Sequence, residues 1–314
     1  MNAPIVTLQP DRSKFLGGSD MAAVMGVSPW KTPVELWMEK TGQSVHEDTD
    51  PAREKRLARG KKLEPFIIDM VIDKLRAEGH EVQLIRCNER YVDPEHPFLA
   101  CEIDMELLLD GEHINGDAKS VHGFARKKWG DEHTEDVPIE YAAQFMHGLG
   151  ITGRSRCLVA ALSSFDDVSI YWVNRDDETI AAMRAKAVQF WTDCVLGGAK
   201  PDPIEFGDIK ALFPLDDGTS IEATSNIADK VIRLSGVKSQ IKDLEDEEAR
   251  LQFDIANFIS PHALLTFGGR EIASWKAQQA RRFDQKRFAE AHPDLVPAFT
   301  TTTTQRVLRI KKGK

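Results

Sequence analysis

The stretch ACEIDMELLLDGEHINGDAKS (residues 100–120) decides the fold class of this chain. Apolar and polar side chains alternate through most of residues 99–109, which is the spacing of a β-strand with two unlike faces. The Asp110-Gly111 step that follows is a strong hairpin signal. Residues 112–120 complete the pattern as a returning strand, so the stretch predicts a β-hairpin.

This hairpin brings acidic side chains together. Glu102, Asp104 and Glu106 alternate onto one face of the first strand, and Asp117 and Lys119 share a face of the second. A hairpin can therefore place Asp104, Asp117 and Lys119 on one side. Facing carboxylates repel unless a positive charge lies between them, and oxygen-only ligands favour Mg²⁺ or Mn²⁺ over zinc. The pattern predicts a divalent-metal site, although a solvated hairpin with charged edges gives the same pattern.

The spacing of Asp104, Asp117 and Lys119 resembles the core of the PD-(D/E)XK nuclease motif. In that chemistry two carboxylates hold a metal that polarises the scissile phosphate and lowers the pKa of a bound water. The lysine lies beside the water, where it orients it and stabilises developing charge. An acid-x-Lys pattern alone is weak support for such a site, so the surrounding residues have to decide.

Helical and extended patterns alternate around the hairpin and predict an α/β (α+β) fold, a central mixed β-sheet flanked by helices. Apolar residues recur at helical spacing, or follow capping residues, in several segments. The predicted helices are residues 21–25, 33–41, 65–77, 139–149 and 176–196. The further predicted strands are residues 82–86, 156–162 and 168–174.

Composition shifts near Gly197 divide the chain. Residues 1–205 are expected to form the core domain, and the Gly-, Pro- and Asp-rich residues 206–220 a linker. In residues 221–260 apolar side chains fall close to heptad spacing, which indicates one long amphipathic helix or a helical hairpin. Residues 261–314 predict a small α+β extension with candidate strands at 264–267, 271–275 and 306–310. The sequence assigns no role to residues 221–314.

Composition excludes several classes of protein. With 314 residues, 41% of them hydrophobic, the chain can bury a sizeable core. The formal charge of −9 argues against a protein that coats nucleic acid over its whole surface, but it permits a local basic channel. No apolar run reaches the roughly 18 residues of a membrane span, and the start lacks signal-peptide character. The four cysteines show no zinc spacing. We expect a cytoplasmic protein with no membrane partner.

Further motifs follow one another in a recognisable order. The motif GSDMAA begins at Gly18, with Arg12 seven residues before Ser19, and GKKLE ends at Glu64. ACEID ends at Asp104, DAK covers residues 117–119, and YAAQ ends at Gln144 and is followed by GITG at 150–153. In this order and over most of residues 10–195, the chain resembles the lambda-exonuclease and YqaJ-type phage recombination nucleases, a family of the PD-(D/E)XK superfamily.

The resemblance implies roles for the residues at the metal site. Glu64, Asp104 and Asp117 would be metal ligands, together with the backbone carbonyl of Ala118. Lys119 would act on the nucleophilic water, and Gln144 would lie against the active site. All five side chains would belong to the catalytic set (Glu64, Asp104, Asp117, Lys119, Gln144). The implied cofactor is a pair of Mg²⁺ ions, for which Mn²⁺ can substitute.

The resemblance also implies an activity and partners. Arg12 and Ser19 would bind a 5′-terminal phosphate at a helix N-terminus, and Arg126 is a further candidate for that DNA-binding pocket. The chain would then be a 5′-to-3′ exonuclease acting on double-stranded DNA ends, releasing 5′-mononucleotides and leaving 3′ single strands for annealing. Further implications are a homotrimer, a single-strand annealing protein as partner, and a phage or prophage origin in a bacterial host.

The chain departs from the family pattern beside the first aspartate. Ile103 stands where the family often has proline, and Glu102 stands where a small hydroxyl residue is common. Asp117 replaces the commoner glutamate and is one methylene shorter. Two other functions stay open: a PD-(D/E)XK endonuclease, which needs no 5′-phosphate pocket, and a non-catalytic DNA-binding or assembly module, suggested by residues 221–260 and the basic tail.

Overall fold

The computed structural model describes residues 11–43, 51–163 and 167–311. The chain divides into two compact units, Met1–Leu212 and Phe213–Lys314. None of the helices in the described ranges combines the length and the apolar composition needed to cross a membrane.

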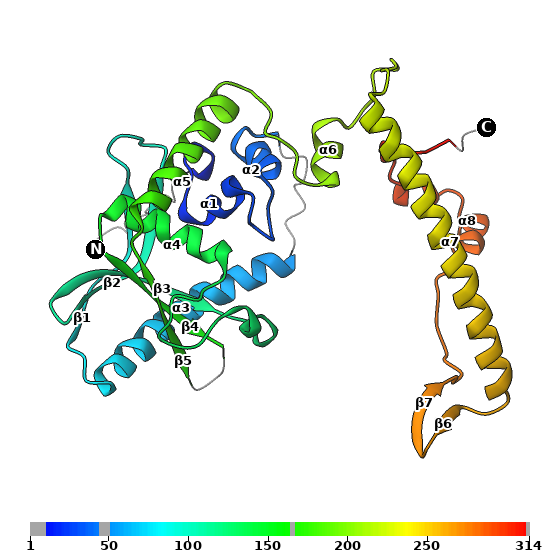
Figure 1. Cartoon of the computed structure of the whole chain (residues 1–314), viewed down its shortest axis with the longest axis horizontal. Helices are drawn as coiled ribbons and strands as arrows, with labels where there is room; N and C mark the ends of the chain where they lie inside the picture. The colour runs from blue at the N-terminus through cyan, green and yellow to red at the C-terminus, as the bar shows by residue number, and fades with distance from the viewer. Residues whose placement is uncertain (1–10, 44–50, 164–166, 312–314) are drawn as a thin grey trace. The chain divides into compact units, whose positions relative to one another are not determined.

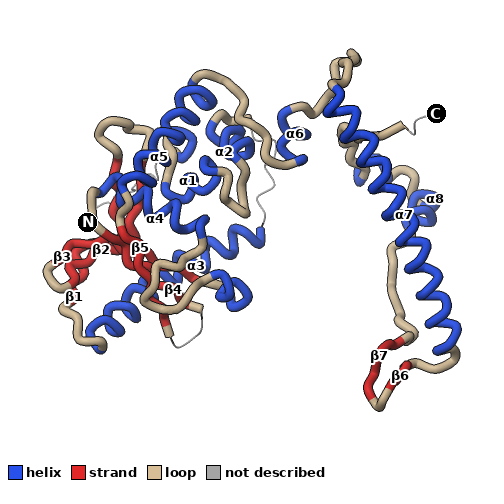
Figure 2. The backbone as a smooth tube through the Cα atoms, in the orientation of Figure 1, coloured by secondary structure: helices blue, strands red, loops and turns tan. Residues whose placement is uncertain are grey.

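The first unit is built on a five-stranded mixed sheet, drawn in red in Figure 2. Its strands are β1 (Val82–Val92), β2 (Ala100–Leu109), β3 (Glu112–Ser120), β4 (Arg156–Leu162) and β5 (Val168–Asn174), which lie in that order across the sheet. The β3–β4 pair is parallel and the other three pairs are antiparallel. The predicted fold class, a mixed sheet flanked by helices, is confirmed.

The β2–β3 hairpin forms where the sequence predicts it. Leu109 pairs with Glu112 across a two-residue turn. Asp110 and Gly111 both have positive φ, 50° and 83°, which is the conformation that a two-residue turn requires and that Asp-Gly adopts readily. The turn fixes the strand register, and the register fixes which side chains of β2 and β3 share a face.

Helices cover both faces of this sheet (Figure 1). Helix α3 (Pro51–Ala77) packs Ile67 and Val71 on the face that carries Met105 and Leu107. Helix α4 (Ile139–Thr152) packs Phe145 on the opposite face, against residues of β4 and β5. Every residue of β4 after Arg156 is buried, because strands covered on both faces lose their polar side.

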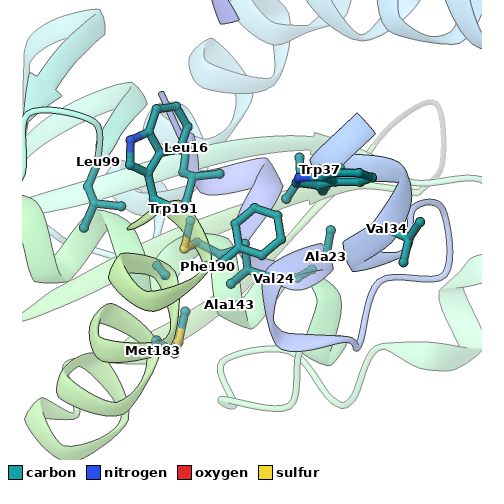
Figure 3. Packing of buried hydrophobic residues seen from close by; sticks show 14 of the residues in the cluster. Leu16, Ala23, Val24, Val34, Trp37, Leu99, Ala143, Met183, Phe190 and Trp191 are labelled. Carbon is teal, nitrogen blue, oxygen red and sulfur yellow. The ribbon is translucent and has the colours of Figure 1, made fainter. Parts of the chain in front are cut away.

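A third apolar cluster holds the N-terminal helices against the rest of the unit (Figure 3). Helices α1 (Gly18–Met25) and α2 (Pro33–Lys40) contribute Val24 and Trp37, and α5 (Asp177–Gln189) with its π-helical continuation Phe190–Leu196 contributes Phe190 and Trp191. Full burial of such a side chain is worth about 1.5–3 kcal/mol. This cluster fixes the start of α1 beside α4.

Two predicted boundaries are wrong. The helix expected at 65–77 begins at Pro51 and runs through Pro65, because residues 54–64 are rich in strong helix formers that outweigh one interior proline. The strand expected at 82–86 continues to Val92, because its second half pairs with β2. Of the four free thiols, Cys101 and Cys157 are buried and Cys87 is exposed.

Part of the segment expected as a linker is helical. Helix α6 (Phe206–Leu212) belongs to the first unit: Thr32 donates a hydrogen bond of 2.5 Å to the buried carboxylate of Asp208, and Leu212 joins the cluster with Trp37. Long-range contacts of this kind leave no local signal in the sequence.

The second unit is dominated by one helix, α7 (Ser225–Ile259), rather than a helical hairpin. It is followed by the hairpin β6 (Leu264–Phe267) and β7 (Arg270–Ser274), then α8 (Gln285–Ala291) and the short helical turn Val296–Phe299. The predicted strand at 306–310 is wrong, because no neighbouring strand pairs with that segment within the described residues.

Candidate functional site

A cavity of about 120 Å³ lies between the start of α1, the hairpin strands and α4. Six of its lining residues carry the polar groups that matter below: Arg12, Ser19, Arg90, Asp104, Asp117 and Gln144. The space is sufficient for a hydrated cation and several waters. Five of these six residues, all except Arg90, belong to the set that the sequence singles out, and together they span more than 100 positions of the chain.

Two carboxylates and a lysine meet on the α4 side of β2 and β3. Asp104 Oδ2 accepts a hydrogen bond of 2.9 Å from the backbone N–H of Ala118. Lys119 Nζ lies 2.6 Å from Asp117 Oδ1 as an ion pair. That oxygen is buried and has no hydrogen-bond partner of good geometry. The hairpin thus assembles the acid-x-Lys group.

Gln144 connects α4 to this group. Its Nε2 donates a hydrogen bond of 3.0 Å to Asp117 Oδ2. A Cβ on Gly18 would lie 3.0 Å from Gln144 Cγ, so α1 and α4 approach this closely because residue 18 has no side chain. Lys119 Nζ also lies 5.6 Å from the ring centre of Tyr141, one turn before Gln144, which gives the ammonium a cation–π contact.

Burial and mutual repulsion change the protonation of these groups. Burial, followed by the charges of Asp117 and Glu64, raises the pKa of Asp104 to about 7. Burial acts to lower the pKa of Lys119, but the charges of Asp117 and Asp104 raise it above its ordinary value. Lys119 therefore stays an ammonium, and Asp104 is partly protonated at neutral pH; a bound cation would displace that proton.

This donor set fits a hard divalent cation. Asp104 and Asp117 offer only oxygen, and they repel one another. Ala118 faces the site through its N–H group. Among the described residues, however, no three His, Cys, Asp or Glu side chains gather closely enough to form a ready metal site.

Of the three acids expected to bind metal, Glu64 is the one that does not lie beside Asp104 and Asp117. It lies on α3, the helix that packs on the opposite face of the sheet from α4, and it does not line the cavity. Its charge still raises the pKa of Asp104 and that of Cys87 on β1. Glu64 therefore lies near the acidic pair without joining it in this arrangement.

Arg12 and Ser19 form one arm of the cavity. Arg12 Nη2 donates a hydrogen bond of 3.0 Å to Ser19 Oγ, and it lies 3.7 Å from Asp20 Oδ1. Asp20 is buried, accepts the N–H of Gly17 at 3.0 Å, and pairs with the buried Lys40 at 2.8 Å. Asp20 is therefore held by buried partners, whereas the side chain of Arg12 is 55% exposed to solvent.

Arg126 lies elsewhere. Its Nη1 donates hydrogen bonds to the carbonyl oxygens of Trp129 and Gly130, at 3.2 and 3.1 Å, and it does not line the cavity. It stabilises the loop after the 3-10 segment Gly123–Lys128. Its guanidinium is thus engaged in local structure.

Arg90, which lines the cavity from β1, was not predicted from the sequence. Its guanidinium stacks 4.0 Å above the ring centre of Phe15, and its Nη1 is buried without a hydrogen-bond partner. Glu102 lies 3.8 Å from that nitrogen and has a 63% exposed side chain, so it faces Arg90 rather than the acidic pair. Arg90 was missed because β1 was expected to end at residue 86.

Comparisons with known proteins agree with the motif order. Residues 8–155 match the family model described as the YqaJ-like viral recombinase domain. The chain is 28% identical over 310 residues to the uncharacterized protein YqaJ of Bacillus subtilis (strain 168), a match that covers 96% of this chain and 92% of that protein. The match therefore includes the second unit.

Solved structures show more distant similarity. LHK-Exo, an alkaline exonuclease from Laribacter hongkongensis, solved with dAMP, is 18% identical with a TM-score of 0.42, covering 58% of this chain and 88% of that one. A phage-related exonuclease from Haemophilus somnus 129PT is 13% identical with a TM-score of 0.37, covering 59% and 96%. Likeness at this level does not carry an activity from one protein to another.

Proposed function

We propose that the chain, whose residues 8–155 match the model of the YqaJ-like viral recombinase domain, is a divalent-metal-dependent exonuclease. Its substrate is a double-stranded DNA end, which it degrades from 5′ to 3′. It releases 5′-mononucleotides and leaves a 3′ single strand for annealing. The observation that supports this most is the cavity that Asp104, Asp117 and Gln144 line together with Arg12 and Ser19, with Lys119 ion-paired to Asp117.

The cofactor that we propose is a pair of Mg²⁺ ions, for which Mn²⁺ can substitute. Asp104 and Asp117 would hold the cation, and the backbone carbonyl of Ala118 and Glu64 are further candidate ligands. Glu64 would have to approach from α3 when the site is loaded. When bound, the metal polarises the scissile phosphate and makes its water more acidic.

The chain's own residues supply orientation and charge. Lys119, kept protonated by Asp117 and Asp104, stabilises negative charge that develops on the phosphate. Gln144 holds the carboxylate of Asp117 in place through its 3.0 Å hydrogen bond. Water attacks the phosphorus, the bond to the 3′ oxygen of the terminal nucleotide breaks, and that oxygen leaves with a proton. The nucleotide departs with its 5′ phosphate.

The arm formed by Arg12 and Ser19 gives the reaction its end preference. The guanidinium and hydroxyl lie at the N-terminus of α1, where backbone N–H groups favour an anion. A 5′ phosphate held there would place the next phosphodiester over the carboxylates. Arg126, occupied by backbone carbonyls, could contribute only after its loop rearranges.

Partners and setting are also proposed from the family resemblance. We propose that the chain assembles as a homotrimer around DNA, hands its 3′ strand to a single-strand annealing protein, and works in the cytoplasm of a bacterial host that carries a phage or prophage. No membrane is involved in this activity.

Digestion of linear duplexes in Mg²⁺ tests the proposal. Substrates that carry a fluorescent label near one 5′ or one 3′ end, with or without a 5′ phosphate, are compared with relaxed closed circles. We expect loss from the 5′ side first, faster turnover with a 5′ phosphate, and intact circles. Cutting of circles would assign an endonuclease instead, and binding without degradation would assign a non-catalytic DNA-binding module.

A further inference from the structure

Helix α7 is the long helix of the second unit (Figure 1), and nearly all of its residues are exposed. Of its 35 residues only Ile259 is buried, and Ser235 and Ala256 are half-buried. Thr224 caps its start by accepting the N–H of Ile227. An exposed helix that carries many large apolar side chains needs a surface to cover them.

Most of the exposed apolar side chains of α7 fall on one stripe at heptad spacing, whereas Val231, Ile232 and Phe253 lie off it. Ten positions make up this α7 stripe, and eight of them are apolar: Ile227, Leu234, Val237, Ile241, Leu244, Leu251, Ile255 and Phe258. Each of the eight is at least 38% exposed. Lys230 and Glu248 occupy the other two positions. Alternating steps of three and four residues over this length are the pattern of a coiled-coil seam.

Charge along α7 is divided between its two halves. Residues 225–242 carry four basic side chains and one acidic one, whereas residues 243–259 carry six acidic side chains and one basic one. The basic set is Lys230, Arg233, Lys238 and Lys242; the acidic set is Asp243, Glu245, Asp246, Glu247, Glu248 and Asp254. Two such helices side by side in parallel would place like charges together, whereas an antiparallel pair would place opposite charges together.

We propose that α7 pairs with α7 of a second copy of this chain as an antiparallel two-stranded coiled coil. In one register the two charged residues of the stripe pair with each other. Lys230 lies opposite Glu248 of the second copy, and by symmetry Glu248 lies opposite Lys230 of the second copy. In that register the residue numbers of any two opposing positions add up to the same total. The apolar layers are then Ile227 with Leu251, Leu234 with Leu244, and Val237 with Ile241.

The same register places flanking charges favourably. Arg233 and Glu247 border the seam on one side, and the antiparallel arrangement brings Arg233 of each copy next to Glu247 of the other. Gln252 Nε2 donates a hydrogen bond of 2.9 Å to Glu248 Oε1, which leaves the second carboxylate oxygen of Glu248 for Lys230 of the second copy. Residues 227–251 overlap, which is about seven helical turns and more than three heptads.

Exchanging the charges of Lys230 and Glu248 tests the orientation and the register of the helix pair together. The full-length chain is measured by sedimentation equilibrium as wild type, Lys230→Glu, Glu248→Lys and the double variant. We expect each single change to weaken self-association by about tenfold or more, since it places like charges opposite one another, and the double variant to recover wild-type association. Lys242→Glu, the same charge change off the stripe, should weaken association far less than either change within the stripe.

Three results would overturn the pairing. Single variants that associate like the wild type would show that the stripe does not form the contact. A double variant as weak as the single ones would exclude the antiparallel register. Single variants that lower the melting temperature without changing association would show that α7 covers its own chain. Nuclease-unit association contributes equally to every variant, and DNA cleavage is not the readout, so failure here leaves the proposed function untouched.

Discussion

Replacement of Lys119 by glutamine probes the charge balance of the cavity. Lys119 Nζ lies 2.6 Å from Asp117 Oδ1, and both side chains are mostly buried. At an effective dielectric constant of about 20 the attraction is roughly 6 kcal/mol, part of which is offset by desolvation of the ammonium. Removing one partner of such a buried pair costs about 3–5 kcal/mol, because the remaining carboxylate is left without a counter-charge.

The effects of Lys119→Gln on stability and on cleavage can be measured separately. Without metal, the melting temperature should fall by roughly 10 °C. Since a divalent cation neutralises the same carboxylates, Ca²⁺ should recover more stability in the variant than in the wild type. Cleavage of a 5′-phosphorylated duplex in Mg²⁺ should fall by about 10²–10³-fold.

The matched control for this variant is Lys128→Gln. Lys128 is 62% exposed and lies 3.6 Å from Glu140, so its loss should change stability little. Differential scanning fluorimetry with and without Ca²⁺, followed by single-turnover cleavage, measures both effects. A Lys119→Gln protein with wild-type stability and a cleavage rate within twofold of wild type would refute the charge balance described for Asp104, Asp117 and Lys119.

Three further changes have defined outcomes. Gln144→Ala removes the 3.0 Å hydrogen bond to Asp117 and should lower the cleavage rate by about tenfold without abolishing duplex binding; equal rates would contradict its positioning role. Arg12→Ala should remove the preference for 5′-phosphorylated over 5′-hydroxyl ends, whereas Arg126→Ala should keep it, as rates on paired substrates will show. Burial lowers the pKa of His147 to about 4 from 6.5, so the unfolded state binds the extra proton between those pH values. Stability should therefore fall by roughly 3 kcal/mol as the pH drops from 6.5 to 4, and His147→Gln should flatten that slope in urea titrations at successive pH values.

The sequence predicted the hairpin and its acidic pair because both depend on local rules. Asp110-Gly111 fixes a two-residue turn, and the turn register then places Asp104 and Asp117 on the same side. Glu106 shares that face, as the alternation predicts, but it is buried and neutralised by Arg154 Nη2 at 2.8 Å. Nothing in the strand pattern distinguishes a catalytic acid from one whose charge is satisfied by a distant arginine.

Features that depend on contacts between distant segments could not be predicted from the sequence. Arg90 reaches the cavity only because β1 continues along β2, and its ring partner Phe15 lies 75 positions away. Glu64 was placed by motif order, which carries no information about the face of the sheet that α3 covers. The charge division along α7 is visible in the sequence, but its exposure is known only from the structure.

Release of the terminal nucleotide from a 5′-labelled, 5′-phosphorylated duplex tests the central claim most directly. Wild type and Asp117→Asn are compared under single-turnover conditions in Mg²⁺ and in EDTA. We expect labelled 5′-mononucleotide from the wild type in Mg²⁺ only, and at least about 10³-fold slower release from Asp117→Asn. A wild-type rate from Asp117→Asn, or equal release in EDTA, would contradict the assignment of this cavity as a metal-dependent exonuclease centre.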